Sequence, residues 1–404
     1  MSRHTRRRSS RQVRLTVVGA GLLATVAAVA TVTVASAGET ARRYDGAGRA
    51  GADHAVFVQG NELAGNTIHV FKRGDDGALS AAGTYATGGK GGDQVDAPTD
   101  SLASQGSLVY DDRSGRLLAV NAGSGTVTSF RVEGQKLMDR QVVASGGDFP
   151  SSIAVSGNLA YVMNAGGRGS VQGFRITAGG LQPLNGSHRS LGLDNEKVPL
   201  FSSSPGQVAF TPGGRELVVT TKSANTIEVF PMRRDGRPVR RAVVNDSAGG
   251  VPFAITFDRA GRMLVAEAEK STVSTYKVRR DGSLKVVQKP LANGQNTLCW
   301  LERAGDFFYG GNTGNSTVTG YRTDRRGMLA LTNDVGIATP PSAQSQGVID
   351  LAVTGDEKFL YVQNATSGTV DGFQIGRNGS LTKVTTATGL PPFAESGMEG
   401  IVAV

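Results

Sequence analysis

One pattern recurs seven times between His54 and Val404, and it constrains the fold more than any other feature of the chain. Each copy has an apolar run, a short polar loop, a Thr/Ser–Val/Ile step and an aromatic residue soon after it. The Val/Ile positions are Ile68, Val127, Val171, Ile227, Val273, Val318 and Val370. They are 59, 44, 56, 46, 45 and 52 residues apart, and a period near fifty indicates stacked or radially arranged supersecondary units.

The third copy shows what one unit contains. Its apolar runs predict short strands at residues 153–155, 159–163, 170–176 and 181–184, because runs of this length bounded by Gly, Asn and Asp are typical of strands. Asp-Gly or Asn-Gly steps such as Asp76-Gly77 and Asn378-Gly379 separate third from fourth strands, as tight hairpins require. Four antiparallel strands repeated seven times predict an all-β, seven-bladed β-propeller.

The two ends of the repeat region each supply part of one blade. Residues 399–404 read as a first strand with nothing after it, and residues 54–58 read as a second strand with nothing before it. Because an unpaired sheet edge is a liability, we expect the N- and C-terminal strands to pair and close the ring.

The N-terminus has the composition of an export signal. Residues 1–37 contain six arginines among the first fourteen residues, then an apolar stretch and a small-residue cleavage site at Ala35-Ser36-Ala37. We predict a signal peptide at 1–37, a linker at 38–53, a propeller at 54–404, and a secreted protein. Twin-arginine export and an uncleaved membrane anchor remain alternatives, the first from Thr5-Arg6-Arg7-Arg8 and the second from the length of the apolar stretch.

Charge and cysteine content exclude several classes of function. The chain has 43 Lys and Arg against 34 Asp and Glu, and removal of the six signal arginines leaves 37 against 34, or +3. This small excess argues against a nucleic-acid partner. Cys299 is the only cysteine, so we expect a buried thiol and no internal disulfide. The sequence contains no metal-binding His or Cys motif, so we expect neither a metal nor a cofactor. We also expect the protein to be a monomer.

Candidate site residues come from the starts of the first strands, which should surround one mouth of the central channel. Aligned there are Ser107, Ser152, Gln207, Ala254, Thr297, Asp350 and Ile401. Asp350 is the one carboxylate, and capping of its own loop is the structural alternative. Long connections at 83–104, 185–205 and 331–346 should rim the same mouth, and loops of this length are often functional. Gln346 belongs to a Ser-Gln-Gly step in the last of them.

A second series marks the ends of second strands. It reads Asn61, Asn121, Asn164, Thr220, Glu267, Asn312 and Asn364. Glu267 is the exception, so we name Glu267 and Asp350 as candidate catalytic carboxylates. Candidate ligand contacts are Ser107, Ser152, Gln207, Thr297 and Gln346.

Several segments resemble the lactonase-type seven-bladed propellers, a family that includes propeller-type 6-phosphogluconolactonases and carboxymuconate cyclases. These segments are 159–174, 205–227, 251–255 and 359–370. The resemblance covers about 54–404 and implies a site that acts on a lactone through a His and a channel Glu. The matching positions here, Ser152 and Gln207, are not His, and the family's Asn-Glu step corresponds to Ala266-Glu267.

Two functions follow from these observations. The neutral Ser, Gln and Thr residues at the mouth favour a non-catalytic module that binds a small molecule, a cell-wall glycan or a protein. The alternative is a hydrolase or cyclase that acts on a small lactone or sugar acid, with Asp350 or Glu267 as base and Gln207 or Ser152 near the oxyanion.

Overall fold

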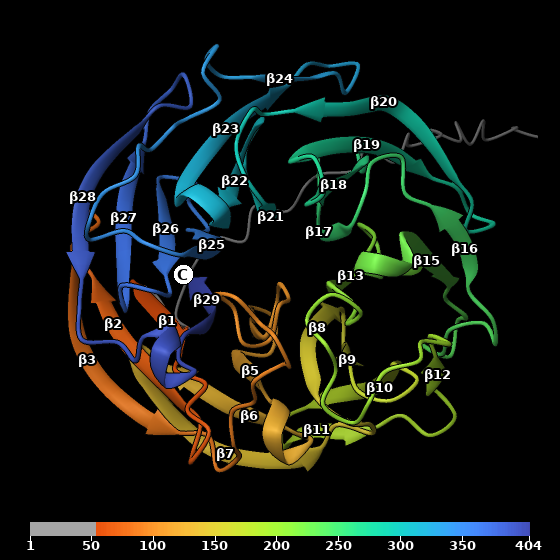
Figure 1. Cartoon of the computed structure of the whole chain (residues 1–404). Helices are drawn as coiled ribbons and strands as arrows, with labels where there is room; N and C mark the ends of the chain where they lie inside the picture. The colour runs from red at the N-terminus through yellow and green to blue at the C-terminus, as the bar shows by residue number, and fades with distance from the viewer. Residues whose placement is uncertain (1–53) are drawn as a thin grey trace, which may run out of the picture. The chain divides into compact units, whose positions relative to one another are not determined.

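The computed structural model describes residues 54–404, which form seven four-stranded antiparallel sheets arranged in a ring (Figure 1). This confirms the predicted seven-bladed propeller. The proposed signal and linker, residues 1–53, lie outside the described residues. Within the described part, no helix is long and apolar enough to cross a membrane.

The blades are numbered from the one that joins the chain ends, and the strands of each are given from the channel outward. Blade 1 contains β29 (Glu399–Ala403), β1 (Ala55–Gln59), β2 (Thr67–Arg73) and β3 (Leu79–Ala86). Blade 2 contains β4 (Leu108–Asp111), β5 (Arg116–Asn121), β6 (Thr126–Glu133) and β7 (Lys136–Ala144). Blade 3 contains β8 (Pro150–Ser156), β9 (Leu159–Asn164), β10 (Ser170–Thr177) and β11 (Gly180–Pro183), and β12 (Arg189–Ser190) also pairs with β10.

Blade 4 contains β13 (Gln207–Phe210), β14 (Glu216–Thr220), β15 (Thr226–Pro231) and β16 (Val243–Asp246). Blade 5 contains β17 (Pro252–Phe257), β18 (Met263–Glu267), β19 (Thr272–Val278) and β20 (Leu284–Ala292). Blade 6 contains β21 (Leu298–Ala304), β22 (Phe307–Asn312), β23 (Thr317–Thr323) and β24 (Leu329–Leu331). Blade 7 contains β25 (Val348–Val353), β26 (Phe359–Asn364), β27 (Thr369–Ile375) and β28 (Leu381–Ala387). Four short 3₁₀ turns are η1 (Ala122–Ser124), η2 (Lys222–Ala224), η3 (Thr313–Asn315) and η4 (Phe393–Glu395).

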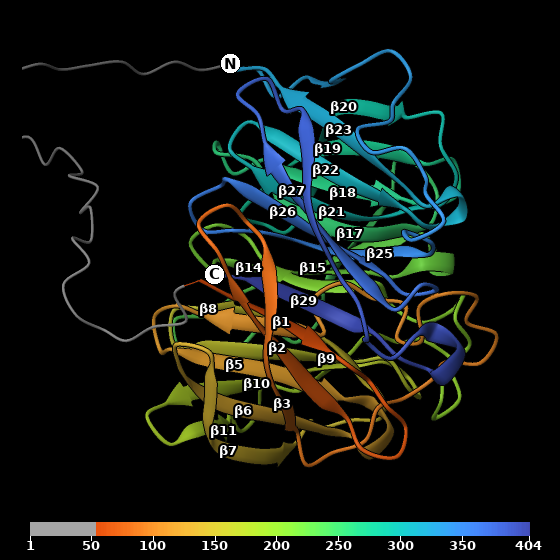
Figure 2. The ribbon, with the colours of Figure 1, turned by 90° about the vertical axis from the view of Figure 1, so that its left-hand side faces the viewer.

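The chain ends close the ring as predicted. Strand β29 pairs antiparallel with β1, with Ile401 opposite Val58 and Ala403 opposite Val56. Figure 2 shows this seam, where the blue C-terminal strand lies beside the orange N-terminal one. All five residues of β1 are buried, so the closing strand covers an apolar edge.

The two faces of the ring carry different connections. The loop face has the connections between blades and the loops from second to third strands, where η1, η2 and η3 lie. The hairpin face has the turns from third to fourth strands. There the glycine alone takes a left-handed φ, +83° at Gly77 and +82° at Gly379, while the side chains of Asp76 and Asn378 accept the backbone N–H two residues on.

A tyrosine in the second strand connects three pairs of neighbouring blades. Tyr161 donates to the carbonyl of Gly236 at 2.8 Å, Tyr309 to Gly379 at 2.9 Å and Tyr361 to Gly77 at 2.8 Å. Each carbonyl belongs to the third-to-fourth-strand hairpin of the next blade. A Cβ at Gly77 would lie 2.4 Å from Phe359, so the glycine also permits close packing between the blades.

The first strands begin with an irregularity that the sequence alignment did not include. Phe149, Val251, Thr297 and Met398, each just before a first strand, have φ between +55° and +61°. The pairing then shifts by a bulge in the first strands of blades 1, 3, 5, 6 and 7. A bulge re-aims the side chains that follow it, so position along the sequence does not give position around the channel.

Candidate functional site

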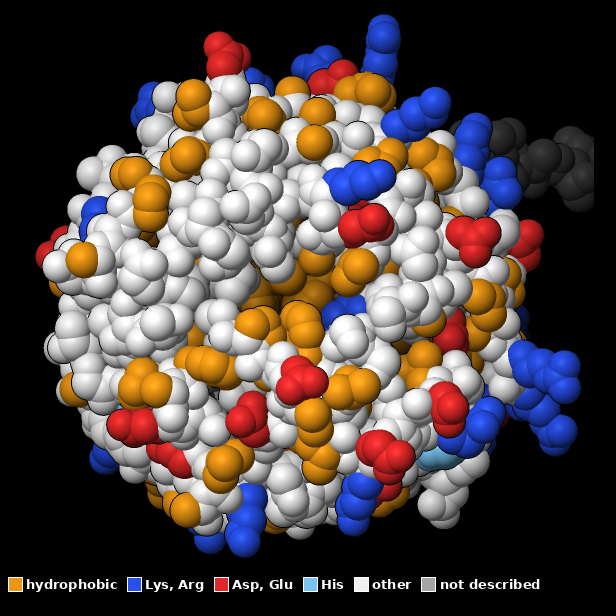
Figure 3. Space-filling view, viewed as in Figure 1, with side chains coloured by type: hydrophobic (Ala, Val, Ile, Leu, Met, Phe, Trp, Pro, Cys, Tyr) orange, Lys and Arg blue, Asp and Glu red, His pale blue; other side chains and the backbone are white. Residues whose placement is uncertain are grey.

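The central channel is crossed by residues 100–106, which we call the plug. This segment lies in the connection from blade 1 to blade 2, and Figure 1 shows the orange loop reaching the centre of the ring. Residues 100–105 are all buried. We expected this long connection to rim the mouth, whereas its end fills the channel. Figure 3, drawn from the loop face, shows a central hollow lined by apolar side chains.

Contacts with four blades hold the plug in place. Leu102 N donates to Glu399 Oε1 of blade 1 at 2.9 Å, and Ser104 Oγ donates to the carbonyl of Ser151 in blade 3 at 2.7 Å. Lys222 Nζ of blade 4 donates to the carbonyl of Ala103 at 2.9 Å. Gln105 donates to Glu302 Oε1 of blade 6 at 2.8 Å. The channel is therefore occupied by the chain itself.

Beside the plug lies a buried group of ionisable side chains. Burial raises the pKa of Asp100 and that of Glu399, and the two carboxyl groups share a hydrogen bond that raises the pKa of Glu399 further. Burial lowers the pKa of Lys222 to about 7, although the charge of Asp100 opposes this shift. Burial raises the pKa of Cys299 to about 12. The predicted buried thiol is confirmed, and it is not a thiolate at neutral pH.

A cavity of about 270 Å³ lies in the channel on the other side of the plug. The plug contributes Gln105 and Gly106 to its wall, and six inner strands contribute the rest. The inner strands end near the hairpin face, and the half-exposed residues Tyr110, Val353 and Val402 line the cavity there. The cavity therefore opens on the face opposite to the one that we expected from the loops.

Two carboxyl groups line this cavity, Glu302 of β21 and Asp350 of β25. Burial raises the pKa of Glu302 to about 7. Burial also raises the pKa of Asp350 well above its usual range, and the charge of Glu302 raises it further. The backbone N–H groups of Leu351 and Ile401 donate to Asp350 at 2.9 and 3.4 Å and partly oppose this shift. Near neutral pH the pair therefore holds both proton donor and proton acceptor capacity.

The cavity contains two of the predicted site residues, Asp350 and Gln207. Gln207 Oε1 accepts a hydrogen bond from Ile255 N at 2.5 Å, which fixes its amide at the wall. Ser152 is completely buried behind the plug and donates from Oγ to the carbonyl of Gln105 at 2.7 Å. Ser107, also completely buried, accepts from Gly400 N at 2.7 Å and so supports the closing strand. The two serines therefore hold the plug and the closing strand in place, and neither lines the cavity.

Three other predicted residues lie elsewhere. Glu267 is completely buried in blade 5, where it accepts five hydrogen bonds; the donors are Ser247 Oγ, Gly249 N, Thr272 Oγ, Ser274 Oγ and Tyr276 Oη. It lies on a different blade from Asp350 and is not among the residues that line the channel cavity. Thr297 is exposed on the loop face, and Gln346 donates to the carbonyl of Ser342 at 2.5 Å. The structure therefore does not bring these three together with Asp350.

Sequence reasoning missed Glu302, Gln105 and the buried group around Lys222. Glu302 gave no distinct signal, because four of the seven first strands contain one acidic residue and β21 is otherwise mostly apolar. The plug gave no such signal, because a Gly- and Ser-rich connection has no periodicity. Among the residues that the structure describes, no cluster of three or more His, Cys, Asp or Glu is arranged to hold a metal ion.

Comparison with known proteins agrees with this architecture. Residues 194–302 match the family model described as "Lactonase, 7-bladed beta-propeller". A solved structure of a protein from Lactobacillus plantarum has a TM-score of 0.66 at 16% identity, over 86% of this chain and 98% of that one. The periplasmic gluconolactonase of Pseudomonas aeruginosa has a TM-score of 0.62 at 18% identity, over 86% of this chain and 99% of that one.

At these identities the solved structures establish the fold alone. No curated protein matches the sequence significantly. The chain is therefore a seven-bladed β-propeller, and residues 194–302, which contain blades 4 and 5, are similar in sequence to the lactonase family model.

Proposed function

We propose that the protein hydrolyses a small neutral lactone in the channel cavity, with Glu302 and Asp350 as the acid–base pair. The observation that carries this proposal is that both carboxyl groups line one cavity that opens to solvent, and burial raises the pKa of each. A volume of about 270 Å³ suits a single small ring.

The chemistry needs one ionised and one protonated carboxyl group. The carboxylate accepts a proton from water while the water oxygen bonds to the carbonyl carbon of the lactone. The protonated carboxyl group gives its proton to the ring oxygen as the bond between that oxygen and the carbonyl carbon breaks. The product is a hydroxy acid, and a proton shift between Glu302 and Asp350 restores the starting state.

The test compares three single variants with the wild type on a panel of neutral γ- and δ-lactones. Glu302→Gln and Asp350→Asn should each lower kcat/KM at least about 100-fold, the usual contribution of a general acid or base. Glu228→Gln is the matched control, because burial also raises the pKa of Glu228 to about 7, but this residue does not line the cavity. Its kcat/KM should stay within about twofold of the wild type.

The pH dependence gives a second measurement. Because burial raises the pKa of Glu302 to about 7, the rate should fall as pH drops below about 7 and the base becomes protonated. The hydrolase proposal fails if no lactone in the panel is opened, or if Glu302→Gln and Asp350→Asn keep full activity.

Binding without turnover is the second candidate, and a cavity of about 390 Å³ on the loop face favours it. Asp93, Asp148 and Lys197 line this cavity together with the apolar residues Phe149 and Leu63. Acidic groups beside an apolar wall suit the hydroxyl groups and the ring faces of a sugar. Glycan binding that survives Glu302→Gln but is lost in Asp148→Ala would support this role.

The remaining expectations concern location and assembly. We propose that residues 1–37 direct export and that the propeller is a monomer. Fractionation of cells that make the full chain, with sedimentation of the purified protein, tests both. Protein retained in the cytoplasm, or a concentration-independent dimer, would contradict them.

A further inference from the structure

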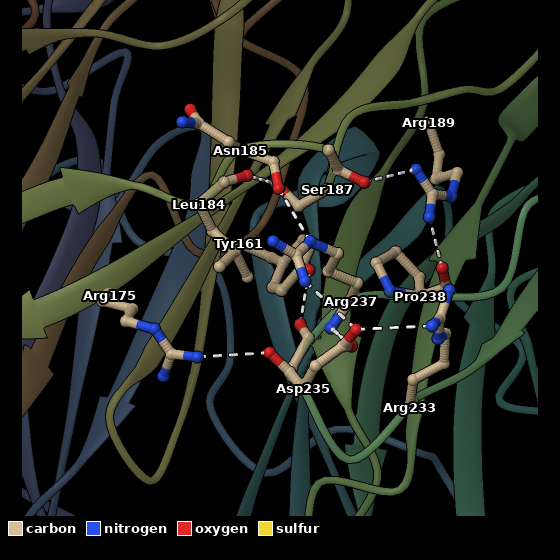
Figure 4. Close-up of polar contacts among 12 residues, drawn as sticks. Tyr161, Arg175, Leu184, Asn185, Ser187, Arg189, Arg233, Asp235, Arg237 and Pro238 are labelled. Carbon is tan, nitrogen blue, oxygen red and sulfur yellow. Dashed lines mark hydrogen bonds and ion pairs between the residues drawn. The ribbon is translucent and has the colours of Figure 1, made fainter.

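A cluster of arginines surrounds the hairpin between β15 and β16, on the outer part of blades 3 and 4. We call it the arginine cluster; its members are Arg175, Arg189, Arg233, Arg234, Arg237, Arg240 and Arg241. Segments 175–189 and 232–241, which contain these seven residues, have one acidic residue between them, Asp235. Figure 4 shows four of the arginines arranged around this hairpin.

Backbone carbonyl groups hold three of these side chains, those of Arg175, Arg189 and Arg237. Arg175 donates to the carbonyl of Asp235 at 3.2 Å, and Arg237 donates to that of Asn185 at 2.7 Å. Arg189 donates through Nε to the carbonyl of Val239 at 2.7 Å and through Nη1 to that of Gly186 at 3.0 Å. A carbonyl orients a guanidinium group but does not cancel its charge.

The one carboxylate in the cluster is shared. Asp235 Oδ2 lies 3.1 Å from Arg237 Nη1 and 3.5 Å from Arg233 Nη2. Burial lowers the pKa of Arg189, and the positive charges of Arg233, Arg240 and Arg237 lower it further. The arginines therefore repel one another in the folded protein, and a bound anion would relieve that repulsion.

Three members are free to meet a ligand. Arg234, Arg240 and Arg241 are exposed, and none of them has a side-chain hydrogen bond or ion pair to any residue in 54–404. These three exposed guanidinium groups concentrate positive charge on one hairpin that no side-chain contact within residues 54–404 neutralises. Neither of the two cavities described above includes these residues.

We propose that the arginine cluster binds a linear polyanion that carries repeated phosphate or carboxylate groups. Guanidinium groups pair with both kinds of group through two parallel hydrogen bonds, and several of them along a hairpin match several charges along a chain. The aromatic ring within the cluster, Tyr161, is completely buried and donates to Gly236, so it offers no face to a nucleic-acid base. This surface is separate from the channel cavity and does not depend on lactone hydrolysis.

The test uses the full chain with two probes, long-chain inorganic polyphosphate and polyglutamate, which separate phosphate from carboxylate recognition. The variant Arg234→Gln/Arg240→Gln/Arg241→Gln removes the three free charges. The matched control Arg279→Gln/Arg280→Gln/Arg377→Gln removes three exposed arginines from hairpins of blades 5 and 7. Both variants keep the six N-terminal arginines, so any binding by that segment is equal in the two.

The cluster variant should bind at least one probe about tenfold more weakly than the wild type, since three exposed charge pairs contribute about 0.5 kcal/mol each. Its plot of log affinity against log salt should be shallower by about 2, from the loss of three contacts. The control should stay within about twofold. The proposal is overturned if the wild type binds neither probe, or if both variants lose affinity equally.

Discussion

Removal of the last five residues, Gly400–Val404, tests how the ring is closed. The deletion removes Ile401, which is 4% exposed, and leaves the edge of β1 unpaired along Val56, Phe57 and Val58, all completely buried. Loss of a buried Ile costs about 2–3 kcal/mol, and partial exposure of the three β1 side chains costs at least about as much again. The total of at least about 5 kcal/mol is comparable with the whole stability of an ordinary domain. We therefore expect the shortened chain not to fold cooperatively.

Trp300 gives a convenient assay for this deletion. It is the only tryptophan, it is 2% exposed, and its ring centroid lies 5.1 Å from that of Phe253. Because Trp300 lies in blade 6 and the deletion lies in blade 1, its fluorescence during denaturation reports unfolding across the ring rather than at the seam. Circular dichroism in the far ultraviolet then shows whether strands remain.

A circular permutant is the control. Val404 N donates to the carbonyl of Ala55 at 2.9 Å, so a short linker can join residue 404 to residue 54, with new ends between the exposed residues Arg280 and Asp281. The permutant keeps every sheet contact and should unfold cooperatively. If the deletion variant unfolds with the same midpoint as the wild type, the closing strand is not needed and this reasoning is wrong.

Three further predictions concern single side chains. Lys222→Met should raise the free energy of unfolding at pH 7, because burial lowers the pKa of Lys222 to about 7 in the folded protein. Between pH 7 and about 10 the unfolded wild type holds a proton that the folded wild type lacks, so its stability should rise by about 1.4 kcal/mol per pH unit relative to the variant. Equal pH profiles of the two proteins in denaturation would contradict this. Glu267→Gln should lower the free energy of unfolding by about 2–4 kcal/mol, because an amide cannot accept all five hydrogen bonds. The kcat/KM of the folded variant should equal that of the wild type. A large loss of activity with unchanged stability would instead show that Glu267 acts in the catalytic site. Thr297→Gly should raise the free energy of unfolding by about 0.5–1 kcal/mol, and with it the melting temperature, because Thr297 has φ +58°. Thr297→Ala should leave the melting temperature nearly unchanged.

The fold could be predicted because its evidence is repeated along the chain. Seven Val or Ile positions at a similar spacing, and strand-like segments at both ends, determine the number of blades and their closure. Local rules also predicted the Asp-Gly hairpins correctly, although the structure gives the left-handed conformation to the glycine alone. What local rules did not predict is that Tyr361 would use the carbonyl of one such glycine, Gly77, 284 residues away.

The candidate site was harder to predict because it depends on register and on one irregular segment. Thr297 was aligned with Asp350, but the pairing of β21 places Trp300, opposite Gly311, at the equivalent position, because a bulge follows Leu298. Gln105, which forms part of the cavity wall, lies in a connection whose sequence has no strand-like periodicity, so its position could not be predicted. Gln207 was identified because β13 begins where the alignment placed it, and Asp350 because it is the one carboxylate in the aligned series, although β25 begins two residues earlier. Glu302 lies inside an apolar strand that reads as core.

The plug also has a consequence for the order of events during synthesis. The hydrogen bond between Leu102 and Glu399 joins residues 297 positions apart, so the ribosome releases the core of the channel long before it releases the strand that encloses it. Asp100 and its neighbours therefore stay exposed to solvent while the other six blades are synthesised. The strand that closes the ring is therefore the last to be made, and a nascent chain that ends before β29 leaves Asp100 without its partner Glu399.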